Sequence, residues 1–312
     1  MRKLLLLLMS ALLLASLPIS HAQTDDLTAE ELALLERIIA GAEYIENLPA
    51  YVINQEEIQA SSTVIFQDGT LAQEQNLEEI RQSQRTFLET ETGPTARETV
   101  TVQELFEGET VVTNGTLVYV DERLFVAAAY ETGSPTYGFE FTQTGFVELA
   151  DPAAPSVYDV LEPEDFVEAI TEEDEDPELT VEALSQAFTT LSVENAELDG
   201  TPVEIISLEF DTEGFLTLSE AQGQPVDEST ARLFEASTTN GAFQFFFGPD
   251  DAVLATILSV EIVAEGVDFA VLNPDAPAGI TLDFTFSSSD DTRVVTTDPA
   301  EIEPITIPPG IE

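Results

Sequence analysis

The side chains that could do chemistry in this chain are almost all oxygen-bearing. Lys3 is the single lysine, His21 the single histidine, and there is no cysteine or tryptophan. Beyond residue 22 the chain keeps carboxylates, hydroxyl groups, tyrosines and seven arginines. A Ser-His-Asp triad, a thiolate nucleophile, a Schiff-base lysine and the usual zinc ligands are therefore excluded there. The sequence predicts no catalytic residue, no cofactor and no enzymatic activity.

Carboxylates alone are enough for one class of enzyme, the glycosidases, which need only a pair of them. The chain has 61 aspartates and glutamates, so some of them will lie close together by chance. No sequence signature singles out one pair. Glycosidase subsites also commonly stack sugars on aromatic rings, and tryptophan is absent. The composition therefore does not favour a glycosidase.

Carboxylates could also bind calcium, which takes several oxygen ligands. The densest acidic run extends from Glu172 to Glu178, but it lacks the D-x-D-x-D-G spacing of an EF-hand loop. We expect it to be a solvated linker, near residues 171–178. Asp250-Asp251 and Asp290-Asp291 are expected to be turn residues. The sequence therefore predicts no metal site.

Two rows of alternating apolar residues are the candidates for binding. Alternation places each row on one side of its strand. Such a row either lines a ligand cavity or packs in an ordinary core, and the pattern leaves both open. If the protein has a ligand cavity, we expect it to be lined by Phe243, Phe245, Phe247, Ile280, Leu282, Phe284 and Phe286.

The N-terminus has the organisation of a secretory signal. Arg2 and Lys3 precede an apolar run from Leu4 to about Leu17, and Ser20-His21-Ala22 offers small residues for cleavage after Ala22. The alternative is an uncleaved anchor, but the run is short for a membrane span and Pro18 interrupts it. We expect a signal peptide over residues 1-22, a single domain over 23-312, no stable transmembrane anchor, and secretion to the extracellular space or a bacterial periplasm.

The formal net charge of −52 limits the partners. A surface this negative repels the phosphate backbone and anionic lipid, so nucleic acid is not expected as a partner. Solubility or adaptation to high salt would explain the acidity. The chain is nevertheless 43% hydrophobic with 19 phenylalanines, enough for a packed core.

Three segments have helical patterns. Thr28 and Glu31 form a capping box for a helix that Pro49 terminates. Pro163 opens a short helix that carries Phe166 and Ile170. A further helix is predicted from the spacing of Val181, Leu184, Phe188 and Leu191.

The rest of the chain alternates as antiparallel strands do. Asn114-Gly115 within Val111–Val120 predicts a hairpin turn, which also explains the glycosylation sequon there, and Asn240-Gly241 predicts another. A turn is expected at Gly248–Asp251, strands at Phe139–Phe141 and Val267–Val271, and antiparallel strands elsewhere. Residues 71-90 stay ambiguous: the spacing slightly favours a helix, yet they also fit a polar strand.

The order of these segments resembles a known family. A leading helix ends at Leu48-Pro49, and Gly115–Val120 is followed by Gly145–Leu149. A proline-bounded segment at Leu161–Phe166 and Leu198–Ile206 come next, before a closing strand pair and Ile305–Pro308. In this layout the chain resembles the LolA-like half-barrel proteins, in particular the LppX/LprG-type bacterial lipoproteins. The resemblance implies an α+β fold with a curved antiparallel sheet and covering helices.

The same resemblance implies a cavity for lipid or acylated cargo. The chain departs from the lipoprotein branch because it has no lipobox cysteine at the cleavage site. We therefore expect a secreted carrier or sensor of a lipid or amphiphilic ligand. The alternative is an extracellular structural or protein-interaction module without a small-molecule ligand.

Overall fold

The computed structural model describes residues 27–106, 109–132, 145–154, 156, 158–171, 180–221, 232, 234, 236–272 and 277–310. These residues belong to two compact units that alternate along the chain. Unit 1 takes residues up to Glu46, Gln59–Asn76 and Asp176–Asp291, and unit 2 takes Asn47–Ile58, Leu77–Glu175 and Thr292–Glu312. The predicted signal peptide and the acidic run Glu172–Glu178 lie outside the described residues, and so does the predicted strand Phe139–Phe141.

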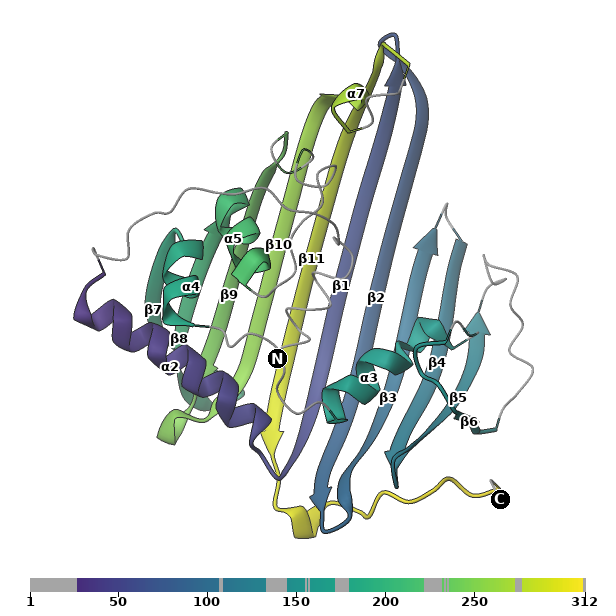
Figure 1. The fold of residues 1–312 in the computed structure, drawn as a ribbon, viewed down its shortest axis with the longest axis vertical. Helices are drawn as coiled ribbons and strands as arrows, with labels where there is room; N and C mark the ends of the chain where they lie inside the picture. Colours follow the sequence, from purple (N-terminus) through teal and green to yellow (C-terminus); the bar gives the residue numbers. More distant parts are fainter. Residues whose placement is uncertain are drawn as a thin grey trace. The chain divides into compact units, whose positions relative to one another are not determined.

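The strands pair as an antiparallel sheet in the order β6-β5-β4-β3-β2-β1-β11-β10-β9-β8-β7 (Figure 1). The strands are β1 (Ala50–Gln67), β2 (Thr70–Thr90), β3 (Gly93–Phe106), β4 (Glu109–Val120), β5 (Arg123–Thr132), β6 (Val147–Leu149), β7 (Thr190–Leu198), β8 (Thr201–Asp211), β9 (Thr238–Phe247), β10 (Val253–Asp268) and β11 (Ile280–Thr296). The predicted α+β class, with a large antiparallel sheet and helices, is confirmed.

Helices cover one face of the strands within each unit (Figure 1). The helices of unit 1 are α2 (Ala29–Glu46), α4 (Val181–Ala187), α5 (Thr212–Ala221) and the short α7 (Phe269–Leu272). Unit 2 contains the 3₁₀ turn η2 (Asp159–Leu161) and α3 (Pro163–Thr171). The 3₁₀ turns η3 (Pro249–Asp251) and η4 (Pro299–Glu301) complete the described elements. None of the helices in the described part of the chain combines the length and apolar character that a membrane span requires.

The predicted start of the first helix is confirmed in atomic detail. The Glu31 amide donates to Thr28 Oγ1 over 3.2 Å, while the Thr28 amide donates to Glu31 Oε2 over 2.8 Å. These reciprocal bonds satisfy amide groups that have no partner inside the helix. The helix at Pro163 and the turn at Gly248–Asp251 are also confirmed.

The ambiguous segment 71-90 is a strand, so the slight preference for a helix is wrong. All of it lies in β2, and Leu77 to Thr90 pair in register with Phe106 to Gly93 of β3. Its apolar spacing suits a helix, but Arg81, Ser83 and Phe87 alternate onto one strand face. Pairing with long neighbouring strands therefore outweighs the local pattern.

The two Asn-Gly hairpin turns are wrong, because both dipeptides lie inside continuous strands. Asn114 pairs with Thr101 and Ala129, and Gly115 pairs with Val100 and Ala128. Here glycine permits close packing instead of a turn. A Cβ on Gly115 would come within 2.5 Å of both Leu161 Cδ atoms, and one on Gly241 would lie 2.0 Å from Phe210 Cζ. The actual reversal between β4 and β5 is at Asp121 and Glu122, both with positive φ.

Two further element boundaries differ from the prediction. The third helix ends at Ala187, and Leu191 lies in β7, where it pairs with Leu208. The alternating run Val267–Val271 leaves the sheet at Asp268, and Phe269 begins α7. In both cases the apolar spacing is right but continues past the point at which the backbone changes conformation.

We predict that Gly115→Ala lowers the free energy of unfolding by about 1–3 kcal/mol, because Leu161 is fully buried and has little room to move. Gly145→Ala is the matched control, since no described atom lies within 4 Å of the position of its added Cβ. Urea denaturation of both variants tests this. Equal stability of the two variants would show that Leu161 repacks freely.

Candidate functional site

An apolar crevice lies in unit 1 between the helices and the sheet. We call it the apolar crevice; its lining comes from α2, α4, β8, α5 and β9 and the loop that follows α4, and consists of Ile38, Leu184, Phe188, Leu208, Leu218, Phe243 and Phe245. Its open volume is about 20 Å³, room for about one water molecule. In this conformation the crevice is therefore almost filled by its own side chains.

Three of the seven residues that line the crevice are phenylalanines, and further rings stack against them. Phe243 and Phe245 stack with ring centroids 5.9 Å apart, and Phe245 and Phe247 at 6.4 Å. On the helix side, Phe188 meets Phe210 edge to face at 6.0 Å. Rings have few rotamers and large apolar faces, so this wall can bind apolar groups by burial alone.

Arg37 of α2 closes the end of the phenylalanine row. Its guanidinium lies 4.4 Å above the ring centroid of Phe247, within the range of cation–π attraction. The same guanidinium forms ion pairs with Glu204 and, at 2.9 Å between Nη2 and Oδ1, with Asp251. The row of Phe243, Phe245 and Phe247 therefore begins in the apolar crevice and ends beside charged side chains at Phe247.

The structure separates the two predicted apolar rows. Phe243 and Phe245 line the crevice, and Phe247 continues their stack. The second row lies on β11, on the far side of β10 from β9, and no member of it lines the crevice. In that row Leu282 is buried, whereas Ile280, Phe284 and Phe286 are half-buried. Whether either row contacts a ligand stays a prediction.

Unit 2 has a second notable site, in which a buried arginine attaches the helix segment to the sheet. Arg81 of β2 donates to the carbonyl oxygens of Val160, at 3.2 Å, and Leu161, at 2.9 Å. It also forms an ion pair with Glu162 at 3.1 Å. These contacts, which we call the charged anchor, satisfy carbonyl groups at the end of η2 immediately before α3 begins.

A neighbouring arginine, Arg85, supports α3 from the same strand face. Its Nε donates to Glu98 Oε2 over 2.7 Å, and its guanidinium lies 5.4 Å from the ring centroid of Phe166. Only 3% of the Glu98 side chain is exposed, so this carboxylate requires its arginine partner. Tyr51 and Phe87 stack at 4.9 Å on the same side.

Burial raises the pKa of two carboxylic acids near the charged anchor, Glu162 and Glu79. It raises the pKa of Glu162 to about 7, because desolvation outweighs the attraction of Arg81 and because the carboxylates of Glu57, Asp165 and Glu79 lie nearby. Burial also raises the pKa of Glu79, with a further contribution from Glu104. Several carboxylates therefore share one buried guanidinium.

We predict that Glu162→Gln stabilises the protein at pH 8 by on the order of 1–3 kcal/mol. The pKa of Glu162 is higher in the folded state, so its contribution favours folding below about pH 4.5 and is lost as the pH rises to about 7. The advantage of glutamine should therefore vanish near pH 4. Urea denaturation from pH 4 to 8 measures it, with the exposed Glu164→Gln as control. A constant difference across that range would contradict this assignment.

Among the described residues, no three acidic side chains are placed to hold a metal ion together. Asp250 and Asp251 form the predicted turn, and both have positive φ. Asp290 and Asp291 instead lie within β11, so the turn expected there is wrong.

The sequence-based search missed the charged anchor. One sequence feature could have indicated the charged anchor. Arg81 and Arg85, two of the seven arginines beyond residue 22, share a strand face in a chain dominated by carboxylates. That signal was hidden while residues 71-90 remained ambiguous, because helix and strand geometry assign different faces. The partners of Arg81 are also about 80 residues away in the sequence.

No protein-family model matches the chain, and no curated protein does. Solved structures that align with it include LprF from Mycobacterium bovis, at 9% identity and a TM-score of 0.34, over 87% of this chain and 98% of LprF. The LolA superfamily protein NE2245 from Nitrosomonas europaea aligns at 9% identity and a TM-score of 0.19, over 87% of this chain and 94% of NE2245. The outer membrane protein OprG from Pseudomonas aeruginosa aligns at 8% identity and a TM-score of 0.17, over 80% of this chain and 97% of OprG. LprF and the LolA protein are of the kinds that the sequence resembles, and the fold class itself follows from the strand pairing of this chain.

Proposed function

We propose that this chain is an exported, non-enzymatic binding protein that takes the apolar part of a lipid or amphiphile into the apolar crevice. The observation that carries the proposal is the all-apolar lining shared by α2, α4, α5 and two strands. Among the described residues, no polar side chain lines this space to demand a specific hydrogen bond. Recognition would therefore rest on burial, at about 25 cal/mol per Å² of apolar surface.

Binding requires the crevice to widen, since about 20 Å³ cannot admit an acyl chain. The elements that would have to move are short: α4 has 7 residues and α5 has 10. Each methylene group that enters contributes about 0.8 kcal/mol, so a chain of several methylenes offsets the loss of a few helix–sheet contacts. The ligand would then select an open state that is rare in its absence.

The amino-acid sequence supports three further parts of the proposal: the class of ligand, the lack of enzymatic activity and export. A net charge of −52 disfavours anionic lipid, so a zwitterionic, neutral or cationic amphiphile is the expected ligand. The chain beyond residue 22 has no lysine, histidine or cysteine for nucleophilic or general-base catalysis. The secretory pattern of residues 1-22 supports export.

The test is a titration of the full chain with palmitoyl-lysophosphatidylcholine, followed by native mass spectrometry. We expect a one-to-one adduct that Leu184→Phe weakens at least tenfold, because the larger side chain fills the crevice from α4. Leu124→Phe is the matched control, a buried leucine that lies in the core of unit 2. An adduct that both variants retain equally would place binding elsewhere.

The small volume of the crevice also favours a second candidate, an extracellular module that binds no small molecule. On that hypothesis the phenylalanine row is ordinary core packing. The same titration separates the two functions: the module predicts no stoichiometric adduct at any amphiphile concentration below micelle formation.

A further inference from the structure

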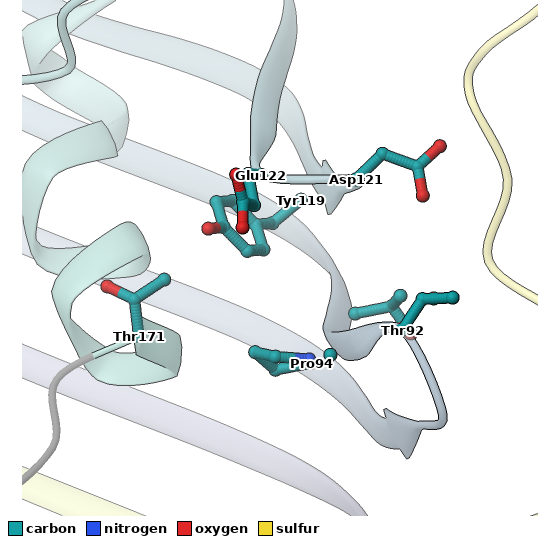
Figure 2. A pocket seen from close by; sticks show the side chains of 8 residues that line it. Thr92, Pro94, Tyr119, Asp121, Glu122 and Thr171 are labelled. Atoms are coloured by element: carbon teal, nitrogen blue, oxygen red, sulfur yellow. The ribbon is translucent and has the colours of Figure 1, made fainter.

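A polar depression of about 210 Å³ lies in unit 2, beside the turns after β2 and β4 (Figure 2). Its polar side chains diverge: in Figure 2 the Tyr119 hydroxyl group points toward Thr171, whereas the Asp121 carboxylate points the opposite way. Asp121 and Glu122 are exposed turn residues. The described lining of this depression therefore does not converge on one ligand, and the stronger candidate for binding is a strand edge in unit 1.

Strand β7 forms the outer edge of the sheet in unit 1. It is the last strand in the pairing order, and Figure 1 shows no strand beyond it. It pairs with β8 along its whole length, and seven of its nine residues are exposed. At the other end of the pairing order, β6 has only three residues. A long exposed edge such as β7 is a template on which another strand can pair.

The turn between β7 and β8 fixes which backbone groups point outward. Asp199 and Gly200 both have positive φ, as a two-residue type I′ turn requires, and Leu198 pairs with Thr201 across them. The pair that closes such a turn is hydrogen-bonded, and hydrogen-bonded pairs then alternate along the strands. The residues of β7 whose amide and carbonyl groups point away from β8 are therefore Leu191, Val193, Asn195 and Glu197.

A proline on β8 agrees with this assignment. Pro202 lies opposite Glu197. Since proline has no N–H group, it fits a pair that is not hydrogen-bonded. Among the described residues, no backbone group bonds to the outward groups of the four residues. We call these amide and carbonyl groups the open edge.

Most of the features that normally protect an edge strand are missing from β7. Natural edges are blunted by bulges, prolines, lysines or short length. Strand β7 keeps one register with β8 throughout and contains neither proline nor lysine. Its Val193 is 42% exposed, and a β-branched side chain favours strand pairing. The protection that remains is negative charge, so the open edge suits a strand that neutralises it.

The charge of this hairpin selects among possible partners. Glu194 and Glu197 are exposed, and neither β7 nor β8 contains a basic residue. A second copy of the chain, paired antiparallel about the middle of β7, would place Glu194 directly opposite its own counterpart. Like charges in that position are destabilising, and each copy has a net charge of −52. A cationic strand would instead form favourable cross-strand pairs with both glutamates.

We propose that the open edge binds an extended, cationic segment of another polypeptide as an additional antiparallel strand. Backbone hydrogen bonds to the open edge supply affinity, and alternate side chains supply specificity. Lysine or arginine side chains lie beside Glu194 and Glu197, and an apolar side chain covers Val193. This interaction does not use the apolar crevice, so it and the function proposed above can fail independently.

The probe is the capped peptide acetyl-Lys-Thr-Thr-Lys-Val-Thr-Val-amide. When it runs antiparallel to β7, its lysines lie opposite Glu197 and Glu194 and its first valine lies opposite Val193. One control peptide has glutamate in place of both lysines. A second control keeps every side chain but is methylated at the backbone nitrogens of the residues that face Asn195 and Val193, which removes two donors to the open edge.

Amide hydrogen exchange of the full chain, measured by NMR at constant ionic strength, tests the proposal. With saturating lysine peptide, we expect the amides of the open edge to exchange at least tenfold more slowly. The amides of Ser192, Glu194 and Ala196 already bond to β8, so their exchange should change far less. Both control peptides should bind at least tenfold more weakly than the lysine peptide.

The matched protein variants are Asn195→Pro and Asn195→Thr. Proline removes an outward N–H group without removing a bond to β8, whereas threonine keeps that group. We expect Asn195→Pro to weaken binding of the lysine peptide at least tenfold and Asn195→Thr to leave it unchanged. Melting temperatures verify that both variants fold, and the methylated peptide tests the same bonds on the unchanged protein.

Several outcomes would overturn the proposal. Equal binding of the methylated peptide would show attraction by charge alone, and equal binding of the glutamate peptide would show that charge does not select the partner. Unchanged exchange at the open edge with saturating lysine peptide would also refute it. Slow exchange there without any peptide, together with a dimer in sedimentation, would show that a second copy occupies the edge instead.

Discussion

Replacing Phe245 with alanine should lower the free energy of unfolding by about 3–5 kcal/mol. The ring is 5% exposed and stacks between Phe243 and Phe247, so its removal leaves a void next to the apolar crevice. Urea denaturation measures the loss. Phe286→Ala is the matched control: that ring is only half-buried, and its loss should cost clearly less.

The same variant tests whether the crevice can accept an apolar guest. A void lined by apolar groups binds small apolar molecules, and a ligand of the folded state raises the melting temperature. Benzene should therefore stabilise Phe245→Ala and leave Phe286→Ala unchanged. If benzene stabilises neither variant, the helices collapse onto the void, and the crevice is a packed core.

Replacing Arg81 with methionine should lower the free energy of unfolding by about 3–5 kcal/mol at pH 8. The substitution leaves two buried carbonyl groups, those of Val160 and Leu161, without their donors. It also removes the cation that offsets Glu162 and its neighbouring carboxylates. The damage is expected in the attachment of η2 and α3 to the sheet of unit 2.

The effect of Arg81→Met should shrink at pH 5. Glu162 already has a pKa of about 7, and without Arg81 it and Glu79 would take up protons still more readily. Protonation removes the repulsion but not the two unpaired carbonyl groups. Urea denaturation at both pH values measures the difference. Arg97→Met, at an exposed position of β3, should change stability by less than about 0.5 kcal/mol, and an equal loss in both variants would refute a special role for Arg81.

The sequence by itself determined the local features whose signals lie within a few residues. The capping box of Thr28 and Glu31 and the helix that starts at Pro163 were predicted correctly. So were the class of the fold and the alternating strands that include Phe243, Phe245 and Phe247. These features depend on backbone dihedral angles and hydrogen bonds between near neighbours, which residue type and spacing control directly.

Only the tertiary structure decided what each glycine, arginine and phenylalanine does. Gly115 and Gly241 carry the same local turn signal as a true hairpin, but a leucine and a phenylalanine from other elements pack against them. Arg81 finds its carbonyl partners about 80 residues along the chain, after residues 71-90 have been fixed as a strand by pairing with β3. Likewise, β10 separates the two apolar rows, and of the two only the row on β9 contributes to the described lining of the apolar crevice. Contacts between distant segments are set by packing and strand order, and no short sequence pattern contains them.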